Sequence, residues 1–444
     1  MNKYKVGLIS LGCDKNRIDS EIILGKIHEK YEIINEPKAA DILIVNTCGF
    51  IEEAKQEAIN TILEMAQYKN NNCKLLIATG CLTQRYGKEL LNLIPELDLI
   101  YGVNDYENLL KGIDEFLNTS EKKDYCNYSN SCINEGERIL TTPSHTAYLR
   151  IAEGCSNYCS YCAIPYIRGQ YRSRKLEDII KEAHVLAKRG VKEIILVAQD
   201  TTKYGVDIYG NNKIHQLVRE ISNIESIKWI RILYCYPEEL KVELIDEMAS
   251  NSKICHYIDL PLQHISNNVL KNMRRKSRKE DILETIDYIR NKMPDVVLRT
   301  SIITGFPGET EEDFSELKEF IENVKIDKLG VFKYSQEEGT KAALMDNQIS
   351  EEVKEKRYRE LMITQQRVSR SKNNNKINKI YEVLIEGKKD EYWYGRSYEM
   401  APEIDGAIWF KCDKILHVGN FIKIKVTEAL EYDLIGVVCD ESCK

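Results

Sequence analysis

Three closely spaced cysteines, Cys155, Cys159 and Cys162, are the residues of this chain best suited to chemistry. They follow the pattern C-x3-C-x2-C, and Tyr161 lies directly before the third. A 4Fe–4S cluster usually has four thiolate ligands, one for each iron. Three thiolates in one short loop therefore leave one iron free to bind a small molecule. Tyr161 would place a flat aromatic surface beside that open iron.

Two simpler interpretations of these cysteines are a zinc site and three unrelated thiols. A structural zinc site needs a fourth cysteine or histidine at a characteristic spacing. The nearest histidines, His145 and His184, do not have that spacing. The spacing therefore favours an iron–sulfur cluster with one open iron.

The first hundred residues alternate between short apolar runs and helical patterns. The apolar runs Lys5–Leu11, Asp41–Asn46 and Lys74–Thr79 predict buried parallel strands. Helical patterns lie between them, around Arg17–Lys30 and Ile51–Tyr68. This alternation predicts an open parallel α/β sheet at the start of the chain.

A cysteine follows each of these strands within one or two residues, at Cys13, Cys48 and Cys81. The carboxyl ends of parallel strands line one crevice, so the three thiols should converge there. They would suit a second iron–sulfur cluster, again with one open iron. Three buried thiols are the alternative, since free cysteine is often buried. The corresponding positions on three strands favour the cluster.

The 444 residues are enough for about three domains. A composition of 43% hydrophobic and 30% charged residues is typical of a soluble globular protein. The net charge of −7 gives no support for binding nucleic acid through a broad basic face. No apolar run approaches the ~18 residues of a membrane span. With 14 cysteines and no secretion signal, we expect a cytoplasmic protein whose thiolates bind metal.

Six further strand-like runs, mostly separated by helical stretches, lie between residues 146 and 373. They predict a partial (β/α)6 barrel with its site at the carboxyl ends of the strands. Gln199, Tyr234, Gln263 and the turn Gly305–Thr310 follow later strands and should face the barrel mouth. That turn is equally well explained as a loop in which Thr310 caps the next helix. The runs are Tyr148–Ala152, Glu193–Ala198, Trp229–Tyr234, His256–Leu260, Val297–Ile303 and Leu329–Tyr334.

The segment from Ile380 to Lys444 has alternating apolar runs and predicts a small five-stranded antiparallel β-barrel of OB-like type. Such barrels often bind nucleic acid. This one has eight lysines or arginines against thirteen aspartates or glutamates. An acidic barrel should repel a phosphate backbone and favour a basic protein partner.

The cysteine loop resembles that of the radical S-adenosylmethionine enzymes, and nearly the whole chain resembles one of their families, the methylthiotransferases. The ribosomal-protein branch (RimO-like) fits better than the tRNA branch, which usually has a more basic terminal barrel. Asp14 departs from the proline expected at its position. The matching stretches are Ser10–Asn16, Asp19–Glu21, Asn46–Ile51, Tyr234–Pro237, Tyr334–Thr340, Gly395–Tyr398 and Ala401–Gly406.

The resemblance implies a division of the chain and a set of cofactor ligands. Residues 1–118 would form an N-terminal cluster domain, 119–140 a linker, 141–373 a radical S-adenosylmethionine core and 374–444 a TRAM domain. No residue would act as an acid or base. Tyr161 and Gln199 would border S-adenosylmethionine. The expected ligands are Cys13, Cys48 and Cys81 for an auxiliary 4Fe–4S cluster, and Cys155, Cys159 and Cys162 for the radical-generating 4Fe–4S cluster.

The activity implied by the resemblance is transfer of a methylthio group to the β-carbon of one aspartate in small-subunit ribosomal protein uS12. One S-adenosylmethionine would donate the methyl group and another would generate the radical. Both open irons must then face one cavity, so the N-terminal crevice should cap the barrel mouth. The expected partners are uS12, met through the acidic terminal barrel, and an external electron donor.

Two other functions remain open at this stage. A tRNA methylthiotransferase acting on an adenosine next to the anticodon would use the same six cysteines and differ chiefly in the terminal barrel. A non-catalytic zinc protein would use some of the thiols as a scaffold. Thiolate triads with an open position suit catalysis better than a scaffold.

Overall fold

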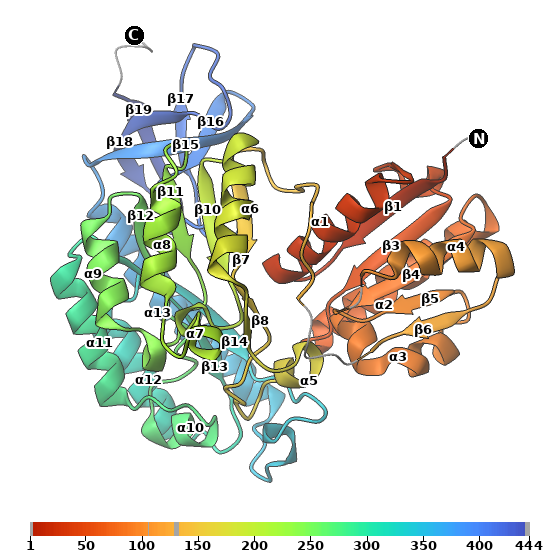
Figure 1. Ribbon diagram of the computed structural model, residues 1–444. Helices are drawn as coiled ribbons and strands as arrows, with labels where there is room; N and C mark the ends of the chain where they lie inside the picture. Colours follow the sequence, from red (N-terminus) through yellow and green to blue (C-terminus); the bar gives the residue numbers. More distant parts are fainter. Residues whose placement is uncertain (1–2, 105, 128–132, 440–444) are drawn as a thin grey trace.

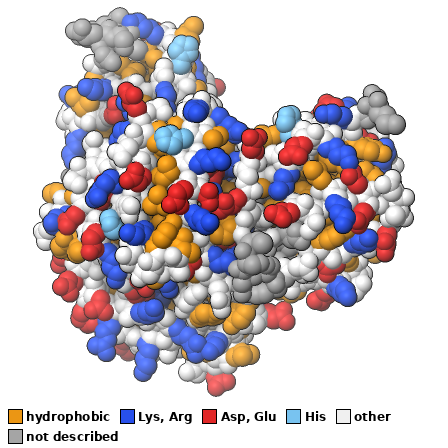
Figure 2. Space-filling view, viewed as in Figure 1, with side chains coloured by type: hydrophobic (Ala, Val, Ile, Leu, Met, Phe, Trp, Pro, Cys, Tyr) orange, Lys and Arg blue, Asp and Glu red, His pale blue; other side chains and the backbone are white. Residues whose placement is uncertain are grey.

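The computed structural model describes residues 3–104, 106–127 and 133–439. Figure 1 shows an N-terminal α/β domain beside a central barrel, and a small β-barrel at one end of that central barrel. A notch separates the N-terminal domain from the small barrel, and Figure 2 shows acidic and basic side chains interspersed on this face. No helix within the described ranges is long and apolar enough to cross a membrane.

The N-terminal domain is a six-stranded sheet in the order β2-β1-β3-β4-β5-β6, and all its pairs are parallel. Apolar side chains of α1 and α4 pack on one face, and those of α2 and α3 on the other. The central strands are therefore buried on both sides. The strands are β1 (Lys5–Ser10), β2 (Glu32–Ile33), β3 (Ile42–Thr47), β4 (Leu75–Gly80), β5 (Leu99–Tyr101) and β6 (Lys123–Tyr125); the helices are α1 (Asp14–His28), α2 (Glu52–Ala66), α3 (Cys81–Leu93) and α4 (Leu109–Thr119), with short 3-10 helices η1 (Pro37–Ala39) and η2 (Gln67–Asn70).

The three strands and two helices expected from the first hundred residues are present. Strand β6, however, lies inside residues 119–140, the segment that we expected to be a linker. It pairs with β5 at the edge of the sheet, where the Tyr125 ring stacks on Tyr101 with 4.7 Å between centroids. A three-residue edge strand in a polar segment has too little periodicity to be detected from sequence.

The central domain is a sheet of six parallel strands in the order β14-β13-β12-β11-β10-β7. The sheet does not close, so it forms the expected partial barrel. Its strands are β7 (Thr146–Arg150), β10 (Glu193–Val197), β11 (Trp229–Ile232), β12 (Ile254–Asp259), β13 (Val297–Thr304) and β14 (Lys328–Lys333), and a separate pair is β8 (Ala152–Glu153) with β9 (Arg172–Ser173). Its helices are α5 (Ile164–Arg168), α6 (Leu176–Lys188), α7 (Val206–Tyr209), α8 (Ile214–Ser222), α9 (Val242–Ser250), α10 (Asn267–Asn272), α11 (Lys279–Lys292), α12 (Glu311–Val324) and α13 (Glu351–Asn374), with η3 (Thr201–Lys203), η4 (Pro237–Glu239) and η5 (Ala342–Leu344).

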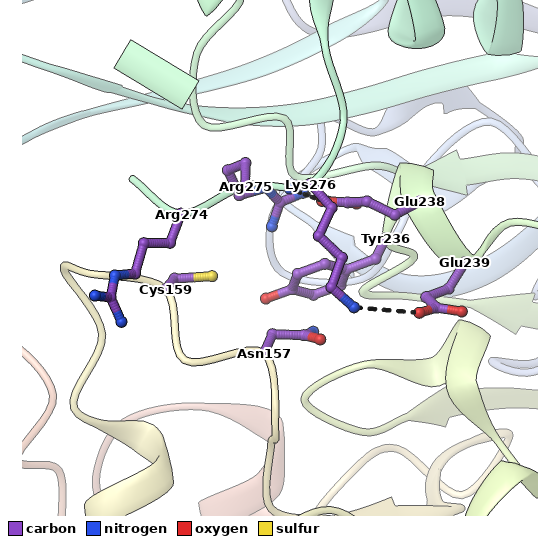
Figure 3. Close-up of a pocket in the computed structure, with 8 residues that line it drawn as sticks. All are labelled: Asn157, Cys159, Tyr236, Glu238, Glu239, Arg274, Arg275 and Lys276. Carbon is purple, nitrogen blue, oxygen red and sulfur yellow. Dashed lines mark hydrogen bonds and ion pairs between the residues drawn. The ribbon is translucent and has the colours of Figure 1, made fainter. Parts of the chain in front are cut away.

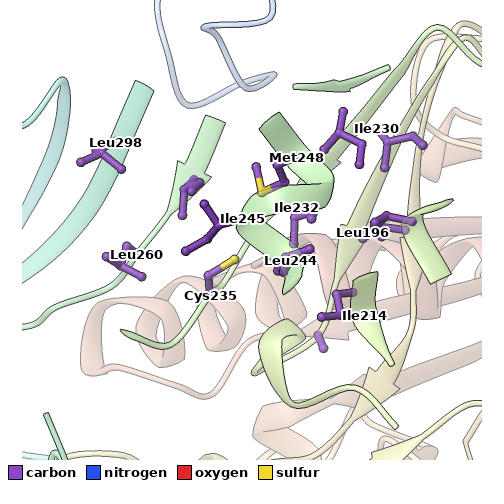
Figure 4. Packing of buried hydrophobic residues seen from close by; sticks show 14 of the residues in the cluster. Leu196, Ile214, Ile230, Ile232, Cys235, Leu244, Ile245, Met248, Leu260 and Leu298 are labelled. Carbon is purple, nitrogen blue, oxygen red and sulfur yellow. The ribbon is translucent and has the colours of Figure 1, made fainter. Parts of the chain in front are cut away.

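The largest apolar core lies between these strands and the helices that cover them (Figure 4). Ile230 and Ile232 point outward from β11, and Leu244 and Met248 of α9 pack near them. Successive residues of each strand point alternately into this core and into the barrel interior. A slip in register would bury polar groups, so the register, and with it the position of each strand end, is fixed.

The C-terminal domain is a closed barrel with strand order β15-β16-β17-β19-β18. Four of its pairs are antiparallel, but β17 and β19 pair in parallel. The barrel was expected to be antiparallel, and its odd strand number explains the difference. Strand direction cannot alternate all the way around a ring of five, so one pair must be parallel. The strands are β15 (Ile380–Lys389), β16 (Tyr392–Arg396), β17 (Ile408–Lys411), β18 (Phe421–Ala429) and β19 (Leu434–Val438).

This small barrel packs against the amino-terminal ends of the central strands. Phe421 meets Trp229, the first residue of β11, edge to face at 4.9 Å between centroids. Leu384 lies in the same apolar cluster, together with Ile18 and Ile22 of α1. Both flanking domains therefore help to fill the interior of the open barrel, and the carboxyl ends of its strands remain on the opposite side.

Candidate cluster-binding sites

The structure brings the three strand-end cysteines of the N-terminal domain together. Cys13 directly precedes α1, Cys48 follows β3 and Cys81 begins α3 after β4. Each cysteine is adjacent to a glycine in the sequence. Gly12 has φ +87°, and a Cβ there would lie 2.9 Å from Cys48 Cβ. The lack of a side chain at Gly12 allows the first two cysteine loops to meet.

Asn16 fixes the relative positions of the three loops. Its Nδ2 donates to Leu11 O at 3.0 Å and to Thr47 O at 2.9 Å. Its Oδ1 accepts from Cys81 Sγ at 3.6 Å. One fully buried side chain thus contacts every segment that carries a cysteine of this group. Asn16 belongs to the matching stretch Ser10–Asn16, but its role does not follow from the sequence pattern.

The electrostatic environment of these thiols shows that they interact. Burial raises the pKa of Cys81 to about 12, the Arg168 guanidinium beside it acts in the opposite direction, and Cys13 and Cys48 raise it further. Burial also raises the pKa of Cys48, and Cys13 again adds to the shift. The charge of a neighbouring thiolate therefore opposes ionisation of Cys48 and of Cys81. A bound cation such as iron would remove that penalty.

The second cysteine group lies in the loop after β8, at the carboxyl face of the central barrel. Gly154 has φ +78°, and a Cβ there would lie 2.1 Å from Gln170 O. Cys155 N donates to Gly169 O at 3.1 Å, which closes the base of the loop. Ser160 holds the middle of the loop, because its Oγ donates to Asn272 O at 2.7 Å.

These three thiols also influence one another. Burial raises the pKa of Cys155 to about 12, and Cys159 contributes in the same direction. Burial raises the pKa of Cys162 as well, with further contributions from Cys159 and Cys155. The loop thus gathers three thiols, and a neighbouring cation would favour ionisation of Cys155 and Cys162.

Tyr161 lies in this loop, and Gln199 is joined to Glu153 just before it. Tyr161 packs against Met273, Phe306 and Tyr334, so much of its ring belongs to an apolar cluster. Gln199 Nε2 donates to Glu153 Oε1 at 2.9 Å. The Gln199 Oε1 atom is buried and has no hydrogen-bond partner among the described residues. It can therefore accept a bond from a ligand donor.

The other residues expected at the barrel mouth have mainly structural contacts. Tyr234 Oη donates to Asp14 Oδ1 at 3.1 Å, across the interface with the N-terminal domain. Gln263 forms a bridge with Ile302. Thr310 caps α12 and accepts from Asp313 N at 3.2 Å, which confirms the capping interpretation of this turn.

Beside Cys159 lies a small pocket that sequence analysis did not predict (Figure 3). The Arg275 guanidinium lies 4.4 Å from the centroid of the Tyr236 ring. Its Nη2 contacts Glu238 Oε2 at 3.3 Å, but its buried Nε and Nη1 have no partner within the described ranges. Unpaired buried donors are costly, so this arrangement suits an anionic ligand such as a carboxylate.

Each cysteine group offers thiols, the ligands that iron–sulfur clusters take. In the described part of the chain, no three Cys, His, Asp or Glu side chains are close enough together to hold one ion. A cube holds its thiolates farther apart than one ion does, because each thiolate binds a different iron. The structure offers two separate groups of three thiols, the ligand type that such a cube binds.

The two groups lie on either side of α5, the short helix that follows the second cysteine loop. Ala163 and Ile167 pack against Cys81 and Val103 of the N-terminal domain. On another edge of the interface, Glu337 binds Lys55 Nζ and Arg85 Nη1, each at 3.1 Å. The N-terminal domain is thus attached to the barrel at two separate places near the cysteine loops.

Comparisons with known proteins agree with this geometry. The Radical SAM superfamily matches residues 149–321, Uncharacterized protein family UPF0004 matches residues 5–102, and the TRAM domain matches residues 377–439. The chain is 63% identical over 442 residues to the "Ribosomal protein uS12 methylthiotransferase RimO" of Clostridium novyi (strain NT), with 100% of both chains covered. The chain belongs to the RimO family.

Other RimO proteins are similar over their full length. That of Clostridium acetobutylicum is 60% identical over 445 residues, and that of Clostridium tetani is 59% identical over 444 residues, each with 100% of both chains covered. The expected resemblance to the ribosomal-protein branch of the methylthiotransferases is therefore confirmed. The three matched domains also confirm the expected fold class of a parallel α/β sheet, a radical SAM barrel and a TRAM barrel.

Solved structures show the same fold at low sequence identity. The radical S-adenosylmethionine methyltransferase TsrM from Kitasatospora setae gives a TM-score of 0.57 at 13% identity, with 75% of each chain covered. The cobalamin-dependent S-adenosylmethionine radical enzyme OxsB gives a TM-score of 0.52 at 13% identity, with 82% of this chain and 56% of that chain covered. These likenesses describe the fold of the RimO-family chain and nothing more.

Proposed function

We propose that this chain is a radical S-adenosylmethionine enzyme that transfers a methylthio group to the β-carbon of an aspartate in ribosomal protein uS12. The observation that supports this most strongly is the identity of about 60% to RimO proteins along the full chain. We assign the six cysteines of the two groups to the ligand positions that such an enzyme needs.

The proposed ligands follow the two groups of interacting thiols. Cys13, Cys48 and Cys81 would hold the auxiliary 4Fe–4S cluster, and Cys155, Cys159 and Cys162 the radical-generating one. When bound, these groups and S-adenosylmethionine supply hydrogen abstraction from an unactivated carbon and the methylthio unit that replaces it. No side-chain base could remove that hydrogen. The side chains of the protein would therefore position the reacting atoms and exclude water from them.

Residues around the second cysteine loop fit S-adenosylmethionine. The unpaired Nε and Nη1 of Arg275 could bind its carboxylate, and the unpaired Oε1 of Gln199 could accept a bond from one of its donors. Tyr161 and Tyr236 would provide apolar walls beside the same loop. These residues bind and orient, and they shield the reacting atoms from water.

The packing of α5 supports a single reaction chamber. Ala163 directly follows Cys162, and it lies in one apolar cluster with Cys81. The two cysteine groups are therefore separated by little more than one short helix. We propose that the two cysteine groups border a common space, in which a substrate would lie within reach of the groups that each would hold.

We propose that the TRAM barrel binds a part of uS12 that lies away from the aspartate to be modified. It packs at the amino-terminal ends of the central strands, opposite the cysteine loop. Part of its acidic surplus is paired within the chain, for example Glu403 with Arg17 at 2.7 Å. The remaining acidic residues would attract the basic ribosomal protein. An external reductant would supply electrons, and the proposed site of action is the cytoplasm, where ribosomes are assembled.

A direct comparison of substrates tests this proposal. The anaerobically reconstituted chain is incubated with S-adenosylmethionine, a sulfide source and a reductant, and with either uS12 or bulk tRNA. Mass spectrometry should find the methylthio group on one aspartate of uS12 and leave tRNA unmodified. Methylthio-adenosine in the tRNA arm and unmodified uS12 would overturn the assignment in favour of the tRNA branch.

A further inference from the structure

A buried network of charged side chains connects the two cysteine groups. Its central member is Arg168, the last residue of α5, whose exposed fraction is 1%. The guanidinium lies six residues after Cys162 in the sequence and reaches the N-terminal domain in space. Sequence analysis gave it no role, because neither its burial nor its partners follow from the cysteine spacing.

On the side of the N-terminal domain, Arg168 contacts the auxiliary group directly. Its Nη2 lies 3.6 Å from Cys81 Sγ. The same nitrogen donates to Asn16 Oδ1 at 2.6 Å and to Asp19 Oδ2 at 3.0 Å. Asn16 is the side chain that holds the three cysteine loops together. Arg168 therefore binds both the Cys81 thiol and the residue that positions it.

On the barrel side, the other arm of Arg168 is held by Glu153, two residues before Cys155. Arg168 Nη1 donates to the two Glu153 oxygens at 3.1 and 3.2 Å. Glu153 also accepts from Gln199 at 2.9 Å and from Arg150 at 2.8 Å. Glu153, which directly precedes the second cysteine loop, therefore fixes the position of the Arg168 guanidinium.

The charges of this network balance one another before any thiolate is counted. Two cations, Arg150 and Arg168, face two anions, Asp19 and Glu153, with all four side chains buried. Arg150 contacts both carboxylates. Among the contacts described, Arg168 is the arginine that also reaches a sulfur. Hydrogen bonds to cluster sulfurs are one of the means by which proteins set the reduction potential of an iron–sulfur cluster.

We propose that Arg168 is a positioning residue that hydrogen-bonds the Cys81 thiolate and thereby raises the reduction potential of the auxiliary cluster, while its other arm ties that cluster to the radical cysteine loop. This inference depends on the proposed function, because it needs a cluster on Cys13, Cys48 and Cys81. A reduced cluster carries one more negative charge than an oxidised one. A neighbouring guanidinium therefore stabilises the reduced form more.

The test is a potentiometric titration of the reconstituted full chain, followed by electron paramagnetic resonance of each reduced cluster. Arg168→Met should shift the potential of the auxiliary cluster to more negative values and leave that of the radical cluster in place. Arg150→Met is the matched control, because it removes a charge from the same network without touching a sulfur. It should shift the auxiliary potential much less.

An unchanged auxiliary potential in Arg168→Met, or an equal shift in Arg150→Met, would overturn the inference. If Arg168→Met does not retain the auxiliary cluster, the wild-type chain provides a second measurement. Electron spin echo spectra of the reduced auxiliary cluster should change when the arginines are labelled with ¹⁵N, and no change would also overturn it. A wild-type chain that binds no second cluster would instead contradict the proposed function.

Discussion

Arg396 Nη2 of the TRAM barrel lies 2.5 Å from Glu193 Oε2 at the start of β10. Arg231 Nε binds the other oxygen of the same carboxylate at 2.9 Å. All three side chains are buried. One carboxylate thus binds two arginines and joins the terminal domain to the central one, and Glu386 Oε1 gives Arg396 a second counter-ion at 2.6 Å.

Glu193→Gln should destabilise the full chain strongly, because it leaves the buried Arg231 guanidinium without its counter-ion and removes one of the two carboxylates that bind Arg396. Breaking a buried ion pair from one side costs about 3–5 kcal/mol. Urea unfolding followed by circular dichroism measures this. Glu391→Gln is the matched control, since its pair with Lys411 is exposed at the surface and should contribute about 0–1 kcal/mol. Equal effects of the two substitutions would contradict the role given to Glu193.

The same carboxylate predicts a pH dependence of stability. Burial opposes its ionisation, but Arg396 and Arg231 outweigh this and lower the pKa of Glu193 from 4.5 to about 2. A lowered pKa means that the stabilisation is complete above pH 4.5 and is lost as the pH falls toward 2. Wild-type stability should therefore fall more steeply than that of Glu193→Gln over this window. If the stability of the wild type and of Glu193→Gln fell equally with pH, the lowered pKa of Glu193 would be contradicted.

Asn16→Ala should release the auxiliary cluster while sparing the radical one. The substitution leaves Leu11 O and Thr47 O without their shared donor, at about 1–3 kcal/mol for each unpaired group. Iron analysis after anaerobic reconstitution should show close to half the wild-type iron. Asn60→Ala, which removes an exposed contact on α2, should retain all of it. Full iron content in Asn16→Ala would show that the hydrogen bonds do not organise the site.

Gly80→Ala should disturb the same site for a steric reason. Gly80 has φ +104°, and a Cβ would lie 2.4 Å from both Asn46 Oδ1 and Thr47 O. Gly190 has φ +96° and no atom within 4 Å of an added Cβ. Gly80 has ψ −154°, a conformation that is essentially restricted to glycine, so alanine there also carries backbone strain of about 1–3 kcal/mol; alanine at Gly190 is strained by its positive φ. Gly80→Ala should therefore lower the free energy of unfolding more than Gly190→Ala and should lose auxiliary iron. Equal losses of stability in the two variants would show that backbone strain, and not the clash with Asn46 and Thr47, causes the effect.

The cysteine positions could be predicted from sequence because they depend on short-range rules. A cysteine just after a buried parallel strand must lie at the carboxyl edge of the sheet, and Cys13, Cys48 and Cys81 followed from that rule. The six central strands and the five-stranded barrel were also visible as apolar periodicity.

The residues that support the site could not be found in this way. Arg168 and Glu337 act across domain interfaces, and sequence spacing carries no information about which domains meet. The sequence does show one indication of Arg168, because a charged residue stands at the end of the apolar stretch that follows Cys162. Its partners in the N-terminal domain became known only from the packing of α5.

The most direct test of the two-cluster account is Cys48→Ala assayed with S-adenosylmethionine and uS12. The second cysteine loop does not involve Cys48, so deoxyadenosine should still form at a rate close to that of the wild type. Methylthio transfer to uS12 should disappear, because the auxiliary group has lost a ligand. Methylthio transfer at the wild-type rate would contradict the central claim that the N-terminal cysteines hold the cluster that delivers sulfur.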